Sequence, residues 1–186
     1  ERETAYASAL SQDRIANLSD AELVQFFFQF ASDGGKVQSG GHRTAPRLQQ
    51  TIEQDPQAFR KHVLQPFEAA FDVAGWLADI DQFKGWGKGI ATIYLNRVNP
   101  KRFVVVNNKS VDAYEALGYP IRRSSLATTY ADLQTAQADL QSRFPALDNY
   151  YRTDALSHFL IGTETGKELI GLDDEGSEDG EDLPAG

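Results

Sequence analysis

Apolar residues recur at helical spacing along most of this chain, and that periodicity restricts it to a mainly α-helical fold. Ser19 and Glu22 form a capping box ahead of an apolar stripe that predicts a helix over 18–30. Similar patterns predict helices starting near Pro46 and at Asp55-Pro56, then over 67–80, 90–98, 110–117, 130–144 and 148–160. Pro66 should kink or split its helix. The only segment with strand character is 102–106, so we expect at most a short strand there.

Charge divides the chain into two parts. Its net charge is −9, but seven of the 27 acidic residues lie within 173–182, which leaves 20 acids against 18 bases, or −2, over 1–172. A run of acids spaced by glycine and serine cannot bury apolar area and repels itself. We therefore predict one helical domain over 1–172, followed by an acidic disordered tail or linker over 173–186.

The composition also excludes several classes of protein. The chain has no cysteine, which rules out disulfides and thiolate metal sites. Its histidines, His42, His62 and His158, are scattered and form no zinc motif, so we expect no metal and no cofactor. No stretch reaches the roughly 18 apolar residues of a membrane helix. The start, Glu1, lacks the pattern of a signal peptide. These features favour a cytoplasmic protein and suggest a segment excised from a longer chain.

A glycine-rich turn at 81–89 is the most informative motif. Between two predicted helices it carries Gly85-Trp-Gly-Lys-Gly89, the form of a helix-hairpin-helix, in which backbone N–H groups at a helix start hold a phosphate. Lys84 and Lys88 would add attraction that does not depend on sequence. A plain corner between helices is the alternative. No strand precedes the turn and GxxxxGK[ST] is absent, so it is neither a Rossmann fingerprint nor a P-loop.

The region 83–118 resembles the helix-hairpin-helix core of the DNA glycosylase superfamily. It carries Lys-Gly-Trp-Gly-Lys-Gly-Ile-Ala, then Asn-Pro-Lys-Arg-Phe-Val-Val-Val-Asn-Asn, then a capped helix ending Leu-Gly. In that family the segment after the hairpin helix ends in the catalytic aspartate. This chain has Asn107 and Asn108 at the equivalent spacing, and Gly89 where bifunctional members carry a lysine nucleophile. The resemblance implies a retained shape without glycosylase chemistry. An active glycosylase would need another acid, and Asp112 is the nearest spare carboxylate.

A second resemblance covers about residues 18–160. The loop Gly-Gly-Lys-Val-Gln-Ser-Gly-Gly-His-Arg-Thr, the block Val-Asn-Asn-Lys-Ser-Val and the late Leu-Asp-Asn-Tyr-Tyr-Arg-Thr-Asp-Ala-Leu-Ser-His-Phe-Leu are similar to N-terminal modules of McrB-like restriction ATPases. In that family such a module selects the DNA target for an AAA+ motor. This segment has no Walker or PD-(D/E)xK motif, so the resemblance implies target recognition alone, with a motor expected elsewhere in the parent chain.

Further candidate contacts lie in the loop 34–44 and after the hairpin helix. The loop carries Lys36, Gln38, His42 and Arg43, which suit phosphates and base edges but also fit an ordinary polar surface loop. Asn108 and Lys109 could contact a nucleotide, although asparagines in such places often cap a helix. Trp86 could stack on a base or pack locally.

Eight of the 18 bases fall within 84–123, against two acids, a local balance of +6. They are Lys84, Lys88, Arg97, Lys101, Arg102, Lys109, Arg122 and Arg123. Affinity for DNA follows such a local patch, although the same side chains could pair with acids elsewhere in the fold. We therefore expect a non-catalytic DNA-recognition module of a restriction or defence system, whose target is either plain or modified DNA. Its predicted contacts are Lys84, Gly85, Trp86, Gly87, Lys88, Gly89, Lys36, Gln38, His42, Arg43, Asn108, Lys109 and Arg102. The alternative is a protein-interaction or assembly domain.

Overall fold

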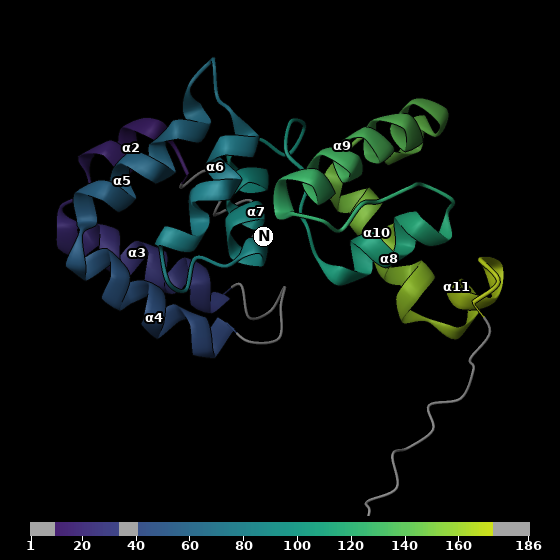
Figure 1. Cartoon of the computed structure of the whole chain (residues 1–186), viewed down its shortest axis with the longest axis horizontal. Helices are drawn as coiled ribbons and strands as arrows, with labels where there is room; N and C mark the ends of the chain where they lie inside the picture. The colour runs from purple at the N-terminus through teal and green to yellow at the C-terminus, as the bar shows by residue number, and fades with distance from the viewer. Residues whose placement is uncertain (1–9, 34–40, 173–186) are drawn as a thin grey trace, which may run out of the picture.

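The computed structural model describes residues 10–33 and 41–172, which form α-helices, short 3-10 helices and no strand (Figure 1). The mainly α-helical prediction is confirmed. The α-helices are α2 (Gln12–Asn17), α3 (Asp20–Asp33), α4 (Gly41–Gln54), α5 (Pro56–Leu64), α6 (Val73–Asp79), α7 (Lys88–Val98), α8 (Asn108–Ala116), α9 (Leu126–Arg143), α10 (Tyr150–Gly162) and α11 (Glu164–Leu169). The 3-10 helices are η2 (Gln65–Phe67), η3 (Ile80–Gln82) and η4 (Pro145–Leu147). The predicted acidic tail, 173–186, lies outside the described residues.

Side-chain caps explain where most helices begin. The capping box is present as predicted, with the Glu22 N–H donating to Ser19 Oγ (3.3 Å) and the Ser19 N–H to Glu22 Oε2 (2.8 Å). The cap of α5 is Asp55, as expected. The helix predicted over 110–117 begins earlier, at Asn108. Asn107 caps α8, because its Oδ1 accepts the Ser110 N–H at 2.8 Å.

The structure also differs from the sequence prediction at α4, α6 and α11. Residues 41–44 do not continue the glycine loop but begin α4, which places Pro46 inside that helix. The buried side chains of Ala45, Leu48 and Ile52 give α4 an apolar stripe that packs along α3 and offsets the helix-breaking residues. The helix expected over 67–80 begins only at Val73, because the Asp72 side chain caps it there. The helix α11 had no counterpart in the prediction.

The segment 103–106 is buried and extended but pairs with no strand among the described residues. Side chains take the place of a neighbouring strand. The Val104 N–H donates to Tyr130 Oη (3.2 Å), the Val106 N–H to Thr92 Oγ1 (3.0 Å), and Asn96 Nδ2 donates to the Phe103 carbonyl (2.7 Å). A buried backbone thus satisfies its hydrogen bonds without a sheet.

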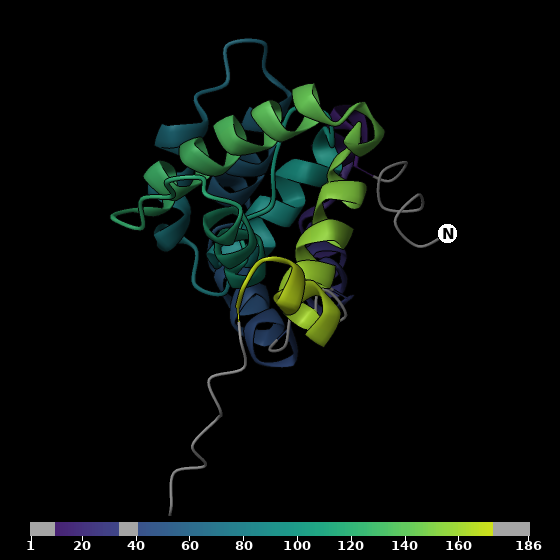
Figure 2. The same cartoon turned by 90° about the vertical axis from the view of Figure 1, so that its right-hand side faces the viewer.

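The elements form two groups around a shared core. Helices α2–α7 gather on one side and α8–α11 on the other, joined through the extended segment (Figure 1). Seen from the side of the second group, α9 runs across its top and α10 descends beside it (Figure 2). One apolar cluster includes residues of both groups, and α6 packs on α9. The central helix α7 is buried from Gly89 to Arg97 and exposes Lys88 at its start. None of the helices in the described ranges is long and apolar enough to cross a membrane.

Candidate nucleic-acid interface

A tight turn joins η3 to α7 at the position of the predicted hairpin, and we call residues 83–87 the hairpin. Its turn is closed by the Phe83 N–H donating to the Ile80 carbonyl (3.0 Å) and the Trp86 N–H to the Phe83 carbonyl (2.8 Å). Gly85 has φ +89°, and a Cβ there would lie 2.4 Å from the Leu48 nitrogen. Both the backbone angle and the close approach require glycine. The hairpin therefore rests directly on the backbone of α4, which makes Gly85 a packing residue rather than an open contact for a phosphate.

The interpretation of Trp86 as a stacking platform is wrong, because its side chain is only 1% exposed. The indole packs edge-on against Phe27 and Phe59, with ring centroids 5.7 and 5.3 Å apart, and against Tyr94 at 5.5 Å. This aromatic contact fixes the hairpin to α3, α5 and α7. Local packing, the alternative considered for this residue, is what the structure shows.

Beneath the hairpin lies a buried histidine. His62 stacks on Trp76, with centroids 4.4 Å apart and planes within 8°, and its ring is 4.8 Å from that of Phe83. Burial lowers the pKa of the His62 imidazole from 6.5 to about 4, so the ring is neutral near pH 7. The His62 ring that packs against Phe83 of the hairpin is therefore uncharged at that pH.

The first turn of α7 differs from the starts of the other α-helices whose N-cap residue is described, because those caps all accept a hydrogen bond through a side chain. Its N-cap is Gly87, which offers no side-chain hydrogen bond, and the first helical bond is donated by Ala91 to the Gly87 carbonyl (3.0 Å). The N–H groups that precede Ala91 in a helix have no acceptor within it. A Cβ on Gly87 would meet nothing within 4 Å, and Lys88 is exposed. Helix starts of this kind attract anions.

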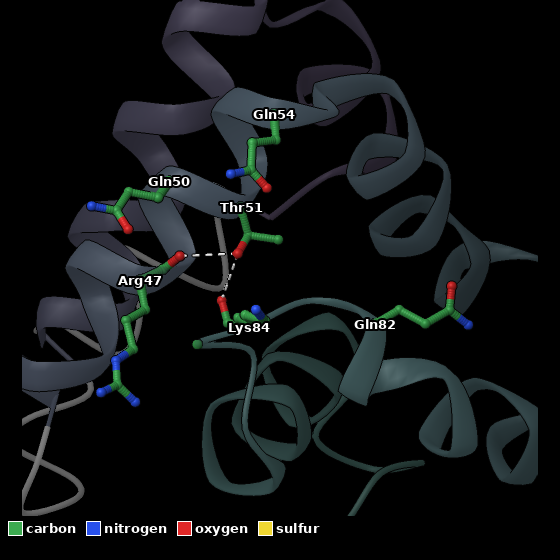
Figure 3. Close-up of a pocket in the computed structure, with 7 residues that line it drawn as sticks. Arg47, Gln50, Thr51, Gln54, Gln82 and Lys84 are labelled. Carbon is green, nitrogen blue, oxygen red and sulfur yellow. Dashed lines mark hydrogen bonds between the residues drawn. The ribbon is translucent and has the colours of Figure 1, made fainter.

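A polar groove lies next to this turn, between α4 and the hairpin (Figure 3). Its volume is about 660 Å³, and it is lined by Arg47, Gln50, Thr51, Gln54, Gln82, Lys84 and Gly85. Thr51 Oγ1 joins its two sides by donating to the carbonyls of Arg47 and Lys84, both at 3.0 Å. Figure 3 shows the α4 side chains standing along one side of that helix, with Lys84 beside them. No carboxylate is among the lining residues.

Part of the predicted basic patch over 84–123 is neutralised by acidic side chains. Arg122 pairs with Asp132 (2.8 Å), and hydrogen bonds from Arg122 lower the pKa of that carboxyl to about 2. Arg123 pairs with Asp112 (2.7 Å) and also with Glu115.

Of two further arginines in that patch, Arg97 is buried, whereas Arg102 is exposed and lies over aromatic rings. Arg97 is 8% exposed, and the Arg102 guanidinium lies over the rings of Phe71 and Phe103, 5.8 and 4.9 Å from their centroids. The bases of the patch that are exposed and pair with no acid in the described part of the chain are Lys84, Lys88, Lys101, Arg102 and Lys109.

The remaining predicted contacts lie apart from the groove. Asn108 is exposed at the start of α8, and Lys109 Nζ lies 3.5 Å from His158 Nδ1 on α10. The bond between Val106 and Thr92 places this end of α8 near the second turn of α7. Gly89 is buried. Lys36 and Gln38 lie outside the described residues, as do the side chains of His42 and Arg43, whose backbone belongs to α4.

Sequence reasoning missed the glutamines of the groove. Gln50 and Gln54 are exposed on α4, on the side opposite the buried stripe that contains Leu48 and Ile52. Their spacing of four residues signals a shared face. Nothing in the sequence distinguishes that face from an ordinary solvated one, because its partner, the hairpin, lies about 30 residues further along the chain.

Comparison with known proteins gives no relative for this chain. No protein-family model, no curated protein and no solved structure matches it.

Proposed function

We propose that this domain is a non-catalytic DNA-recognition module, and that it holds the sugar-phosphate backbone at the start of α7. The observation that carries the proposal is the uncapped first turn of α7, flanked by Lys84 and Lys88. Backbone N–H groups and a helix dipole favour an anion there, and both lysines are exposed and without acidic partners in the described part of the chain. Contacts of this kind bind DNA without reading its sequence.

The absence of catalysis is part of the proposal and rests on the sequence. Asparagine amides at 107 and 108 cannot act as the carboxylate that the glycosylase resemblance would require. In the structure Asn107 is occupied as the cap of α8, which gives this position a role in folding. The McrB-like resemblance adds a context, a cytoplasmic restriction or defence protein in which an AAA+ motor follows the module.

Fluorescence anisotropy with a labelled DNA duplex of two helical turns tests this proposal. Binding should weaken steeply as salt is raised, because phosphate contacts release counterions. Lys88→Glu should weaken binding well beyond Lys61→Glu, a matched control on the exposed surface of α5. Thermal unfolding should be similar for both variants. A flat titration at low salt with plain and methylated duplexes would refute the proposal.

A second candidate, a protein-interaction domain, is favoured by large apolar side chains exposed in the second group of helices. Phe144 is 52% exposed, Phe159 40% and Leu169 70%. Exposed apolar surface of this kind can mark a protein contact. Sedimentation of the isolated domain tests this candidate, since self-association that Phe159→Ser abolishes would support it, and a monomer at all concentrations would count against self-assembly.

A further inference from the structure

The groove between α4 and the hairpin carries only positive charge. Arg47 and Lys84 line it, neither pairs with an acid among the described residues, and no acidic side chain is part of the lining. A concave surface with one sign of charge concentrates ligands of the opposite sign. The ligand that fits this groove is therefore an anion.

Two of the three glutamines that line the groove are free to bind a ligand, whereas Gln82 donates to Asp79 Oδ1 at 3.0 Å. Gln50 and Gln54 make no hydrogen bond with another described residue, whereas neighbouring glutamines are occupied. Gln49 donates to Glu53 at 2.9 Å and Gln57 to Asp20 at 2.9 Å. A side-chain amide has two N–H donors, which suit phosphate oxygens.

The groove is continuous with the start of α7 through the hairpin. Lys84 lines the groove and stands three residues before Gly87, and the Thr51 hydroxyl fixes the Lys84 carbonyl to α4. No aromatic side chain lines the groove, so it offers no surface on which an unpaired base would stack. These features suit the outer backbone of a strand and not its bases.

We propose that this groove binds the phosphodiester backbone of the DNA strand whose neighbouring phosphate sits at the start of α7. This inference rests on the proposed function and extends it. Arg47 and Lys84 pair with phosphates, while Gln50 and Gln54 donate amide hydrogens to phosphate oxygens. The contact does not depend on base sequence, and it makes α4 part of the interface.

Salt titration of duplex binding tests this inference with variants of α4. Each phosphate paired with a cation contributes about 0.9 to the slope of log affinity against log salt. Arg47→Gln should therefore lower that slope by about 0.9, which over a fourfold rise in salt makes the loss of affinity about 3.5-fold smaller. The double variant Gln50→Ala/Gln54→Ala should weaken binding equally on AT-rich and GC-rich duplexes. Lys61→Gln, which removes the same charge from α5, should behave like the wild type.

The outcomes separate this inference from the proposed function. If Lys88→Glu abolishes binding while Arg47→Gln matches Lys61→Gln, the groove proposal is wrong and the function at α7 stands. If the double glutamine variant loses affinity only for AT-rich or only for GC-rich duplexes, the groove recognises bases, and the proposal of backbone binding is wrong. Binding of inorganic phosphate with no binding of duplex would overturn both proposals. The substituted side chains are exposed, and matching thermal unfolding curves confirm that the variants remain folded.

Discussion

Replacing Gly87 with aspartate should stabilise the protein and at the same time abolish DNA binding. Gly87 has φ −68° and ψ 164°, which suits a capping side chain, and a Cβ there meets nothing within 4 Å. Aspartate at an N-cap is better than glycine by a few tenths of a kcal/mol, and its charge at the helix start adds about 0.3 to 1 kcal/mol. In a chain of this size a gain of about 0.5 to 1 kcal/mol raises Tm by about 1 to 4 °C.

The same carboxylate should occupy the free N–H groups of the first turn and repel a phosphate. Hydrogen bonds to a charged group contribute about 1.5 to 3 kcal/mol, so losing them should weaken duplex binding by about ten- to a hundredfold. Anisotropy at low salt measures the affinity, and circular dichroism measures Tm. Gly87→Ala, which adds a side chain without a cap, should leave binding intact. A protein with Gly87→Asp that is more stable but binds DNA like the wild type would show that no phosphate sits at this turn.

Three further predictions concern stability. Burial holds the pKa of His62 at about 4, below its ordinary 6.5, so this residue favours the folded form above pH 6.5 and the protein loses stability as pH falls toward 4. Urea unfolding should show a loss of about 2 kcal/mol in the free energy of unfolding between pH 7 and 5. His62→Gln should remove that part of the pH dependence. Gly118 has φ +87° with open space around it, so Gly118→Ala should lower the free energy of unfolding, measured by chemical denaturation, by about 1 to 2 kcal/mol. Gly85→Ala should lower it more, because its Cβ also meets the backbone of α4. Equal losses for the two variants would contradict that close packing. Thr92→Val should leave the buried N–H of Val106 without an acceptor and lower the unfolding free energy by about 1 to 3 kcal/mol. Thr92→Ser keeps the hydroxyl and should change the unfolding free energy little. If Thr92→Val also changes it little, that hydrogen bond does not support the extended segment.

The sequence predicted helices well where an apolar stripe or a cap is local to the segment. The start of α3 followed from Ser19 and Glu22, and the long helix α9 from its periodic leucines. Prediction failed where a distant partner decides the structure. The segment 103–106 has strand composition, but the described residues form no strand, and side chains from α7 and α9 bind its backbone instead.

The candidate site was predicted only in part for the same reason. Glycine spacing located the hairpin, because tight turns and close backbone contacts require glycine in a recognisable pattern. Spacing could not show that Trp86 points inward, since an aromatic between glycines fits either side of a turn. Net charge over 84–123 overstated the basic patch, because Asp132, which pairs with Arg122, lies outside that window.

Gly85 packs directly against the backbone of α4, and this contact fixes the distance between the groove and the start of α7. This close contact and the hydrogen bond from Thr51 to the Lys84 carbonyl hold the hairpin on α4, so we expect the groove and the start of α7 to keep one separation before any ligand arrives. A surface organised in advance loses little conformational entropy on binding. Such a rigid template should also favour one geometry of nucleic acid over another, and it should distinguish a B-form from an A-form duplex by the distance between successive phosphates rather than by the bases that they carry.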